Sequence, residues 1–127
     1  MTYYFSKTID LDFDSAIIKV TEELKKEGFG ILTEIDVKAT LKKKLDVDFH
    51  KYRILGACNP PFAYQALQAE DKIGTMLPCN VIVQERDGKT EVSAIDPLAS
   101  MQAVKNEALA GIAQEVSLKL RTVIEKL

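Results

Sequence analysis

The sequence has little of several residue types that commonly mark function. Its 127 residues include one histidine and two cysteines, and its charges nearly cancel, with 17 Lys and Arg against 19 Asp and Glu. Domains that bind nucleic acids or anionic membranes usually carry a basic excess. We therefore expect neither a nucleic acid nor a membrane among the partners. Two cysteines are also too few for a four-ligand zinc cluster.

The chain also lacks a long apolar run. A membrane span needs about 20 mostly apolar residues, and the best candidate, residues 109–127, is interrupted by five charged side chains. The N-terminus shows no basic segment followed by an apolar core, so no secretory signal is predicted. A cytoplasmic location is expected, and with it two reduced cysteines rather than a structural disulfide.

No linker rich in Pro, Gly or Ser, internal repeat or low-complexity tract divides the sequence. This continuity predicts one domain over residues 1–127. A chain of this length buries roughly two thirds of the surface that its unfolded form exposes, which is enough for a real core.

Hydropathy patterns predict alternating strands and helices. Apolar residues recurring every second position predict strands, and those recurring every 3.6 positions predict helices. The predicted strands are 2–9, 29–35, 52–58, 77–85 and 90–95; the predicted helices run from Asp12 or Asp14 to Gly28, then over 37–45, 60–70 and 109–127, with a helical turn over 98–103. Tyr3, Phe5 and Ile9 are expected to share one face of the first strand.

The strand patterns favour one fold class. Parallel strands of a doubly wound sheet are apolar on both faces, whereas the first and last predicted strands alternate with polar residues. The Asp87-Gly88 pair is typical of a two-residue hairpin turn. The sequence therefore predicts an α+β fold, in which a curved antiparallel sheet of about five strands carries helices on one face and ends in a long C-terminal helix.

Two Cys-Asn pairs are the main candidates for chemistry. Cys58-Asn59 ends the third predicted strand, and Cys79-Asn80 begins the fourth. If these strands are antiparallel neighbours, both pairs lie at the same rim of the sheet, whereas a crossover connection would place them at opposite ends.

Three uses of these residues stay open. Cys58 and Cys79 could bind a small ligand or a soft metal, with His50 as a possible third metal ligand. Alternatively, Cys58 could be a redox or sulfur-carrying thiolate resolved by Cys79, because it precedes a predicted helix N-terminus. Both could also be small buried groups in an interaction module. Asn59 and Asn80 could offer amides to a ligand or satisfy turns. No particular cofactor or reaction is predicted.

Other polar features have simpler interpretations. The cluster of Lys38, Lys42, Lys43 and Lys44 is typical of a solvated helix face beside nearby aspartates. Asp96, directly before Pro97, is expected to cap a helical turn rather than to act as a catalytic carboxylate.

Several motifs resemble one known family. The segments Gly56-Ala57-Cys58-Asn59-Pro60 and Leu77-Pro78-Cys79-Asn80-Val81, followed by Asp96-Pro97, resemble the bacterial and archaeal domain of unknown function 302 over nearly the whole chain. This resemblance implies a compact α+β domain with an antiparallel sheet, similar in layout to the TATA-binding-protein-like fold, and often a homodimer. It does not imply DNA binding. It favours a shared Cys58/Cys79 site more than composition alone does.

Dimerisation is also suggested by the residues themselves. The first predicted strand begins with the aromatic run Tyr3, Tyr4 and Phe5. A sheet with helices on one side leaves its other face exposed, and large exposed apolar faces usually mark interaction sites. We therefore expect a second copy of the chain to cover that face.

Overall fold

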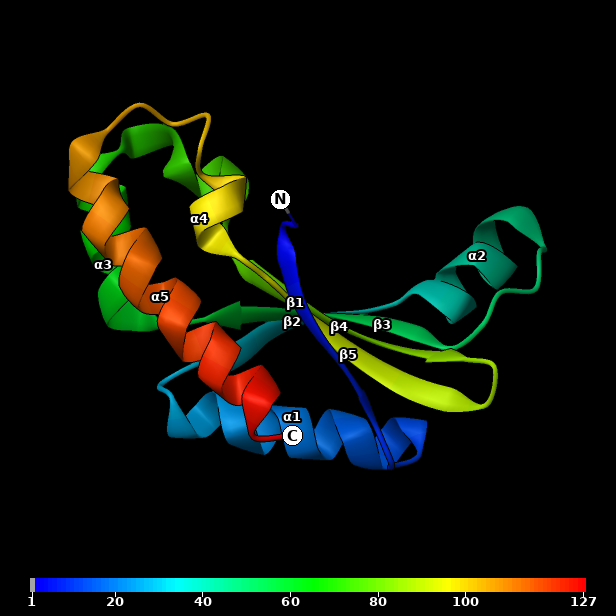
Figure 1. Ribbon diagram of the computed structural model, residues 1–127. Helices are drawn as coiled ribbons and strands as arrows, with labels where there is room; N and C mark the ends of the chain where they lie inside the picture. The colour runs from blue at the N-terminus through cyan, green and yellow to red at the C-terminus, as the bar shows by residue number, and fades with distance from the viewer. Residues whose placement is uncertain (1) are drawn as a thin grey trace.

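In the computed structural model, which describes residues 2–127, a five-stranded sheet forms the centre of the molecule (Figure 1). Its strands lie in the order β1-β5-β4-β3-β2, and every neighbouring pair is antiparallel. The strand bounds are β1 (Tyr4–Ile9), β2 (Gly30–Asp36), β3 (Tyr52–Cys58), β4 (Cys79–Arg86) and β5 (Lys89–Ile95). This architecture confirms the predicted α+β class.

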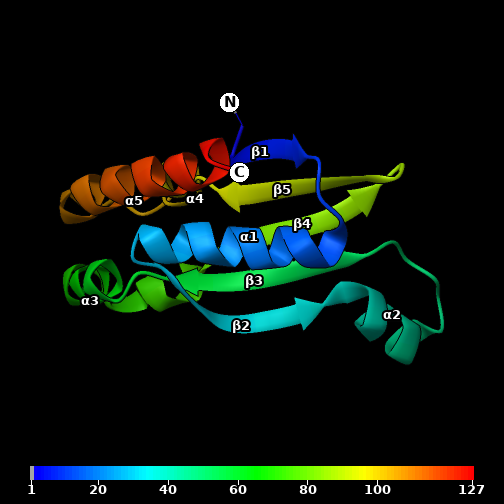
Figure 2. The ribbon, with the colours of Figure 1, turned by 90° about the horizontal axis from the view of Figure 1, so that it is seen from below.

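Helices cover one face of the sheet and extend beyond its ends. They are α1 (Phe13–Lys26), α2 (Val37–Leu45), α3 (Pro60–Ala69), α4 (Pro97–Ser100) and α5 (Glu107–Glu125), with a 3-10 helix η1 (Asp71–Met76). Because α1 joins the two edge strands β1 and β2, it crosses one face, and α5 lies beside it on that face (Figure 2). The helices α3 and α4 gather at one end of the molecule, and α2 lies at the opposite end (Figure 1).

Local signals in the sequence account for most element boundaries. The carboxylate of Asp12 accepts a hydrogen bond from Ser15 N at 2.8 Å and so caps α1, which Gly28 follows with a φ of 89°. Asp87 and Gly88 both have positive φ, which the tight hairpin between β4 and β5 requires. Asp96 caps α4 by accepting from Leu98 N at 3.0 Å. These caps and turns match the predictions.

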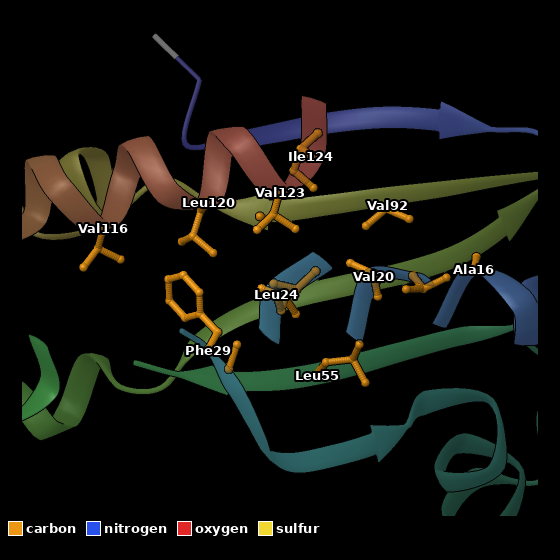
Figure 3. Close-up of a cluster of buried hydrophobic side chains, with 14 of the residues drawn as sticks. Ala16, Val20, Leu24, Phe29, Leu55, Val92, Val116, Leu120, Val123 and Ile124 are labelled. Carbon is orange, nitrogen blue, oxygen red and sulfur yellow. The ribbon is translucent and has the colours of Figure 1, made fainter. Parts of the chain in front are cut away.

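The core lies between the sheet and the two long helices (Figure 3). Alternate side chains of β3, β4 and β5 point toward α1 and α5, which contribute Val20, Leu24 and Leu120, each 0% exposed. Phe5 and Ile9 pack against this cluster. Tyr3 does not share their face as predicted, because it precedes β1 and is 64% exposed.

The opposite face of the sheet has no helix over its middle in the part of the chain that the structure describes (Figure 1). One cross-strand row on this face runs through Ser93, Ile82, Ile54 and Ile35. A shallow groove of about 550 Å³ lies here, and its lining includes Tyr3, Tyr4, Tyr52 and Glu91. This face is therefore partly apolar, and no helix of residues 2–127 covers its middle (Figure 1).

The helix α2 projects from the molecule and buries none of its residues. On this helix, Lys42 pairs with Asp46 at 2.9 Å and with Asp48 at 3.5 Å, and all three side chains are largely exposed. The lysine-rich segment is thus a solvated face, as its pattern indicates. Within residues 2–127, no helix has both the length and the apolar character that crossing a membrane would require.

Candidate functional site

An apolar pocket of about 320 Å³ opens at the end of the sheet where α3, η1, α4 and α5 gather. Its floor is formed by the end of β3 and the start of β4, and α3 and α5 supply opposing walls. The wall residues include Phe62, Ala63, Ala66 and Leu67 from α3, and Ile112, Ala113 and Val116 from α5. Among residues 2–127, no residue that lines the pocket is charged, and Asn59 is the one with an amide side chain.

Both cysteines line this pocket. The strands β3 and β4 are antiparallel neighbours, so the end of β3 and the start of β4 meet at the same rim of the sheet. Of the two arrangements that the sequence left open, this is the one that places both Cys-Asn pairs at one rim. Cys79 lies directly opposite Ala57, while Cys58 pairs with Gly30 on the other side of β3. Because successive residues of a strand point to opposite faces, Cys58 and Cys79 are not a directly opposed pair. Both are free thiols.

The environment of Cys79 keeps its sulfur protonated. Burial, and to a smaller extent the nearby Cys58, together raise the pKa of the Cys79 thiol to about 11. Since the thiolate is the form that attacks electrophiles and binds metals, Cys79 is a poor nucleophile at neutral pH. Its place in the pocket is that of a small apolar group.

The start of α3 offers Cys58 little activation. The charge at a helix N-terminus comes largely from backbone N–H groups that have no partner in the helix. Here the first two helical positions are Pro60 and Pro61, which have no N–H group. The helix end behind Cys58 therefore lacks two of the donors on which the thiolate hypothesis depends.

Asn59 holds two parts of the fold together while it lines the pocket. Its side chain does not cap α3; instead, Nδ2 donates a hydrogen bond to the backbone oxygen of Glu27 at 3.1 Å. The neighbouring Gly28 has positive φ, and a Cβ added there would lie 3.1 Å from Asn59 Nδ2. The side chain is 7% exposed. Asn59 thus joins the start of α3 to the end of α1.

The other two predicted site residues lie elsewhere. Asn80 is exposed, sits opposite Gly56 and lines the groove on the uncovered face rather than the pocket. His50 Nε2 lies 3.0 Å from Gln84 Oε1, and its ring centroid is 4.2 Å from that of Phe49. The seven-residue strand β3, about 20 Å long at roughly 3.3 Å per residue, separates His50 from Cys58. Across residues 2–127, no three His, Cys, Asp or Glu side chains are placed to hold a metal ion.

The sequence did not identify most of the pocket walls. The helices α3 and α5 face each other across it, and small side chains such as Ala63, Ala66 and Ala113 leave the space that the pocket occupies. Ala63 and Ala66 are three residues apart and therefore lie on the same face of one helix. Their spacing is a weak signal, in the sequence, of a helix face with small side chains. The sequence does not show that this face lies opposite α5, because that depends on tertiary packing.

Comparison with known proteins places this fold in a family. A family model described as "Domain of unknown function DUF302" matches residues 5–127. The chain belongs to the DUF302 family. A crystal structure of an uncharacterized conserved DUF302 protein from Bacillus stearothermophilus is similar, with 27% sequence identity and a TM-score of 0.93 over 99% of this chain and 98% of that one. No curated protein matches the sequence. The DUF302 resemblance of the Cys-Asn motifs is therefore confirmed.

Proposed function

We propose that this DUF302 protein binds a small, uncharged and largely apolar molecule in the pocket beside Cys58 and Cys79. The observation that carries the proposal is a pocket of about 320 Å³ with no charged lining residue. Ligand pockets in proteins typically begin at about 300 Å³ and are mostly apolar with few polar groups. A charged ligand would lose its hydration here without gaining an ionic partner.

Filling the pocket should abolish this binding. Ala63 lies on α3, is partly exposed and lines the pocket, so Ala63→Phe can place its ring in that space. We expect 1-octanol to bind the wild-type chain and to bind Ala63→Phe more than tenfold more weakly, because lost contact area lowers affinity. Heteronuclear NMR titration would measure both affinities and show whether shifts cluster at the pocket.

A matched control separates pocket filling from general damage. Ala110 is exposed on α5, and Ala110→Phe adds the same ring outside the pocket. This control should bind octanol like the wild type. The proposal is wrong if the wild-type chain shows no pocket-centred shifts, or if both variants retain full affinity.

The metal and thiol alternatives receive less support. A soft metal would have Cys58 and Cys79 as ligands, but no third His, Cys, Asp or Glu side chain among residues 2–127 is placed to complete such a site. Thiol chemistry at Cys58 would lack two N–H donors at the start of α3. The pocket itself requires neither a deprotonated Cys79 nor an activated Cys58.

We also propose that two copies associate through the uncovered face of the sheet. In a two-fold dimer the same patch meets itself, so a charge close to the axis faces a like charge on the other copy. Among the described residues that line its groove, Glu91 is the single charged one, and Gln84 Nε2 lies 3.3 Å from its carboxylate. The partly buried Ile54 and Ile82 supply apolar area at its centre.

Charge at the centre of this face should break the dimer. Ile82→Lys would bring two ammonium groups together across a two-fold axis, where like charges cost several kcal/mol. We expect dimer for the wild type and monomer for Ile82→Lys in sedimentation velocity at micromolar concentration. Ile18→Lys, at a position 61% exposed on α1, is the matched control and should stay dimeric. A monomeric wild type, or an Ile82→Lys dimer, would overturn this assignment.

A further inference from the structure

Among the described side chains that line the pocket, Asn59 has the one amide, and this group determines what the ligand must carry. We propose that the ligand is a neutral molecule with an apolar body and one hydrogen-bond donor, a hydroxyl or an N–H, that binds Asn59 Oδ1. This inference rests on the proposed function, because it specifies the chemistry of a molecule bound in the same pocket.

The orientation of the Asn59 amide is set by its partner. Nδ2 donates to the backbone oxygen of Glu27 at 3.1 Å, and a carbonyl oxygen can only accept, so the nitrogen must face it. The amide oxygen therefore points away from that contact. No described residue donates to Oδ1.

Asn59 Oδ1 is also reachable. Within residues 2–127, the one fully buried side-chain nitrogen or oxygen without a hydrogen-bond partner is Arg53 Nε. Since Asn59 Oδ1 also has no partner but is not fully buried, it retains contact with accessible space. The residue as a whole is only 7% exposed and lines the pocket, which is why the proposal assigns that space to the pocket.

An unpaired amide oxygen in an apolar pocket discriminates between ligands. A ligand that offers only acceptors or only carbon would displace water from Oδ1 and leave it without a partner, which costs binding free energy. A ligand with a donor replaces that water directly. The same geometry excludes carboxylates, because two acceptors would face each other with no cation nearby.

The volume of the pocket limits the size of the ligand's apolar body. At ~30 Å³ for each water-sized group, a pocket of about 320 Å³ holds roughly ten non-hydrogen atoms. A medium-chain primary alcohol or a bicyclic nitrogen heterocycle such as indole matches this size and carries one donor.

The test compares three probes of nearly equal size on the full chain: 1-octanol, heptyl methyl ether and octanoate. The alcohol has a donor, the ether has only an acceptor, and the carboxylate is charged. We expect the alcohol to bind about tenfold more tightly than the ether, as one hydrogen bond to a buried group implies, and octanoate not to bind. Isothermal titration calorimetry gives the affinities.

The side-chain amide resonances of Asn59 and Asn80 supply a readout that requires no variant. The ¹⁵N–¹H signal of Asn59 should shift with 1-octanol and not with the ether, whereas that of Asn80, on the other face, should move with neither. If the alcohol and the ether bind equally and Asn59 is silent, the donor requirement is wrong while the proposed pocket function stands. If no probe binds, both are wrong.

Discussion

Replacing Gly56 with alanine is expected to destabilise the protein by about 3 kcal/mol, at the upper end of the usual cost of overpacking. Gly56 is buried in β3 between its neighbours. A Cβ added there would overlap Thr33 Oγ1 and lie 2.8 Å from Pro78 Cγ. The ring of Pro78 cannot rotate away, so the backbone of β3 or β4 must move. Chemical denaturation measures the loss in the free energy of unfolding.

The neighbouring strand supplies a matched control. Gly30 in β2 has no atom within 4 Å of an added Cβ and does not have a positive φ. Gly30→Ala should therefore leave stability within about 0.5 kcal/mol of the wild type or raise it slightly. Equal denaturation midpoints for the Gly56→Ala and Gly30→Ala variants would contradict the steric explanation.

A double variant tests which contact dominates. Thr33→Ala removes the hydroxyl that the new methyl group would meet, but it leaves the proline ring in place. We expect Gly56→Ala with Thr33→Ala to recover part of the lost stability and not all of it. Because Pro78 also lines the pocket, a shift of this ring should be visible as weaker octanol binding.

The packing at Gly56 explains why this residue accompanies the Cys-Asn motif. The register of β2 against β3 is irregular between Ile31 and Thr33, and this brings Thr33 opposite Gly56. Thr33 and Pro78 then lie close together above the glycine. Gly56 thus permits β2, β3 and the start of β4 to approach at the rim of the pocket.

The fold was largely predictable because its signals are local. Residues near each boundary, such as Asp12, Gly28 and Asp96, act on their own turn of chain, and the structure uses each of them as its pattern indicates. The sequence does not predict the 3-10 helix η1, because residues 71–76 carry no helical periodicity of their own. They are positioned instead by Ile73, which is buried against other parts of the chain.

The site was only partly predictable because it depends on register. Asn59 and Asn80 occupy equivalent places in the two Cys-Asn motifs, yet one lines the pocket and the other lies on the opposite face of the sheet. A shift of one residue in strand pairing would exchange such faces. The sequence gives no direct measure of that register, nor of the distance between His50 and the cysteines.

Cys79 is expected to react about 100-fold more slowly with alkylating agents at pH 8 than an ordinary thiol. Burial and the neighbouring Cys58 raise its pKa from 9.0 to about 11, and each pKa unit lowers the thiolate fraction about tenfold. Alkylation rates for each cysteine, resolved by mass spectrometry across pH 7–11, give this directly. The same residue in urea-unfolded protein is the control and should react at the ordinary rate.

The raised pKa of Cys79 also predicts how stability depends on pH. The unfolded state loses the Cys79 proton near pH 9, while the folded state keeps it to about pH 11. The stabilising contribution is therefore complete below pH 9 and is lost as pH rises toward 11, at about 1.4 kcal/mol per pH unit. Other groups titrate in this range, so the quantity to compare is the difference between the wild type and Cys79→Ala.

The stability of the wild type minus that of the alanine variant should be constant from pH 6 to 8 and then fall by about 2 kcal/mol between pH 9 and 11, since the alanine variant has no thiol to titrate. Parallel stability curves for the two proteins up to pH 11, together with ordinary alkylation rates in the folded state, would show that Cys79 is solvated and ionisable. The assumption that Cys79 contributes an uncharged group to the pocket lining would then be wrong. Slow alkylation with converging curves instead supports an uncharged floor for the pocket.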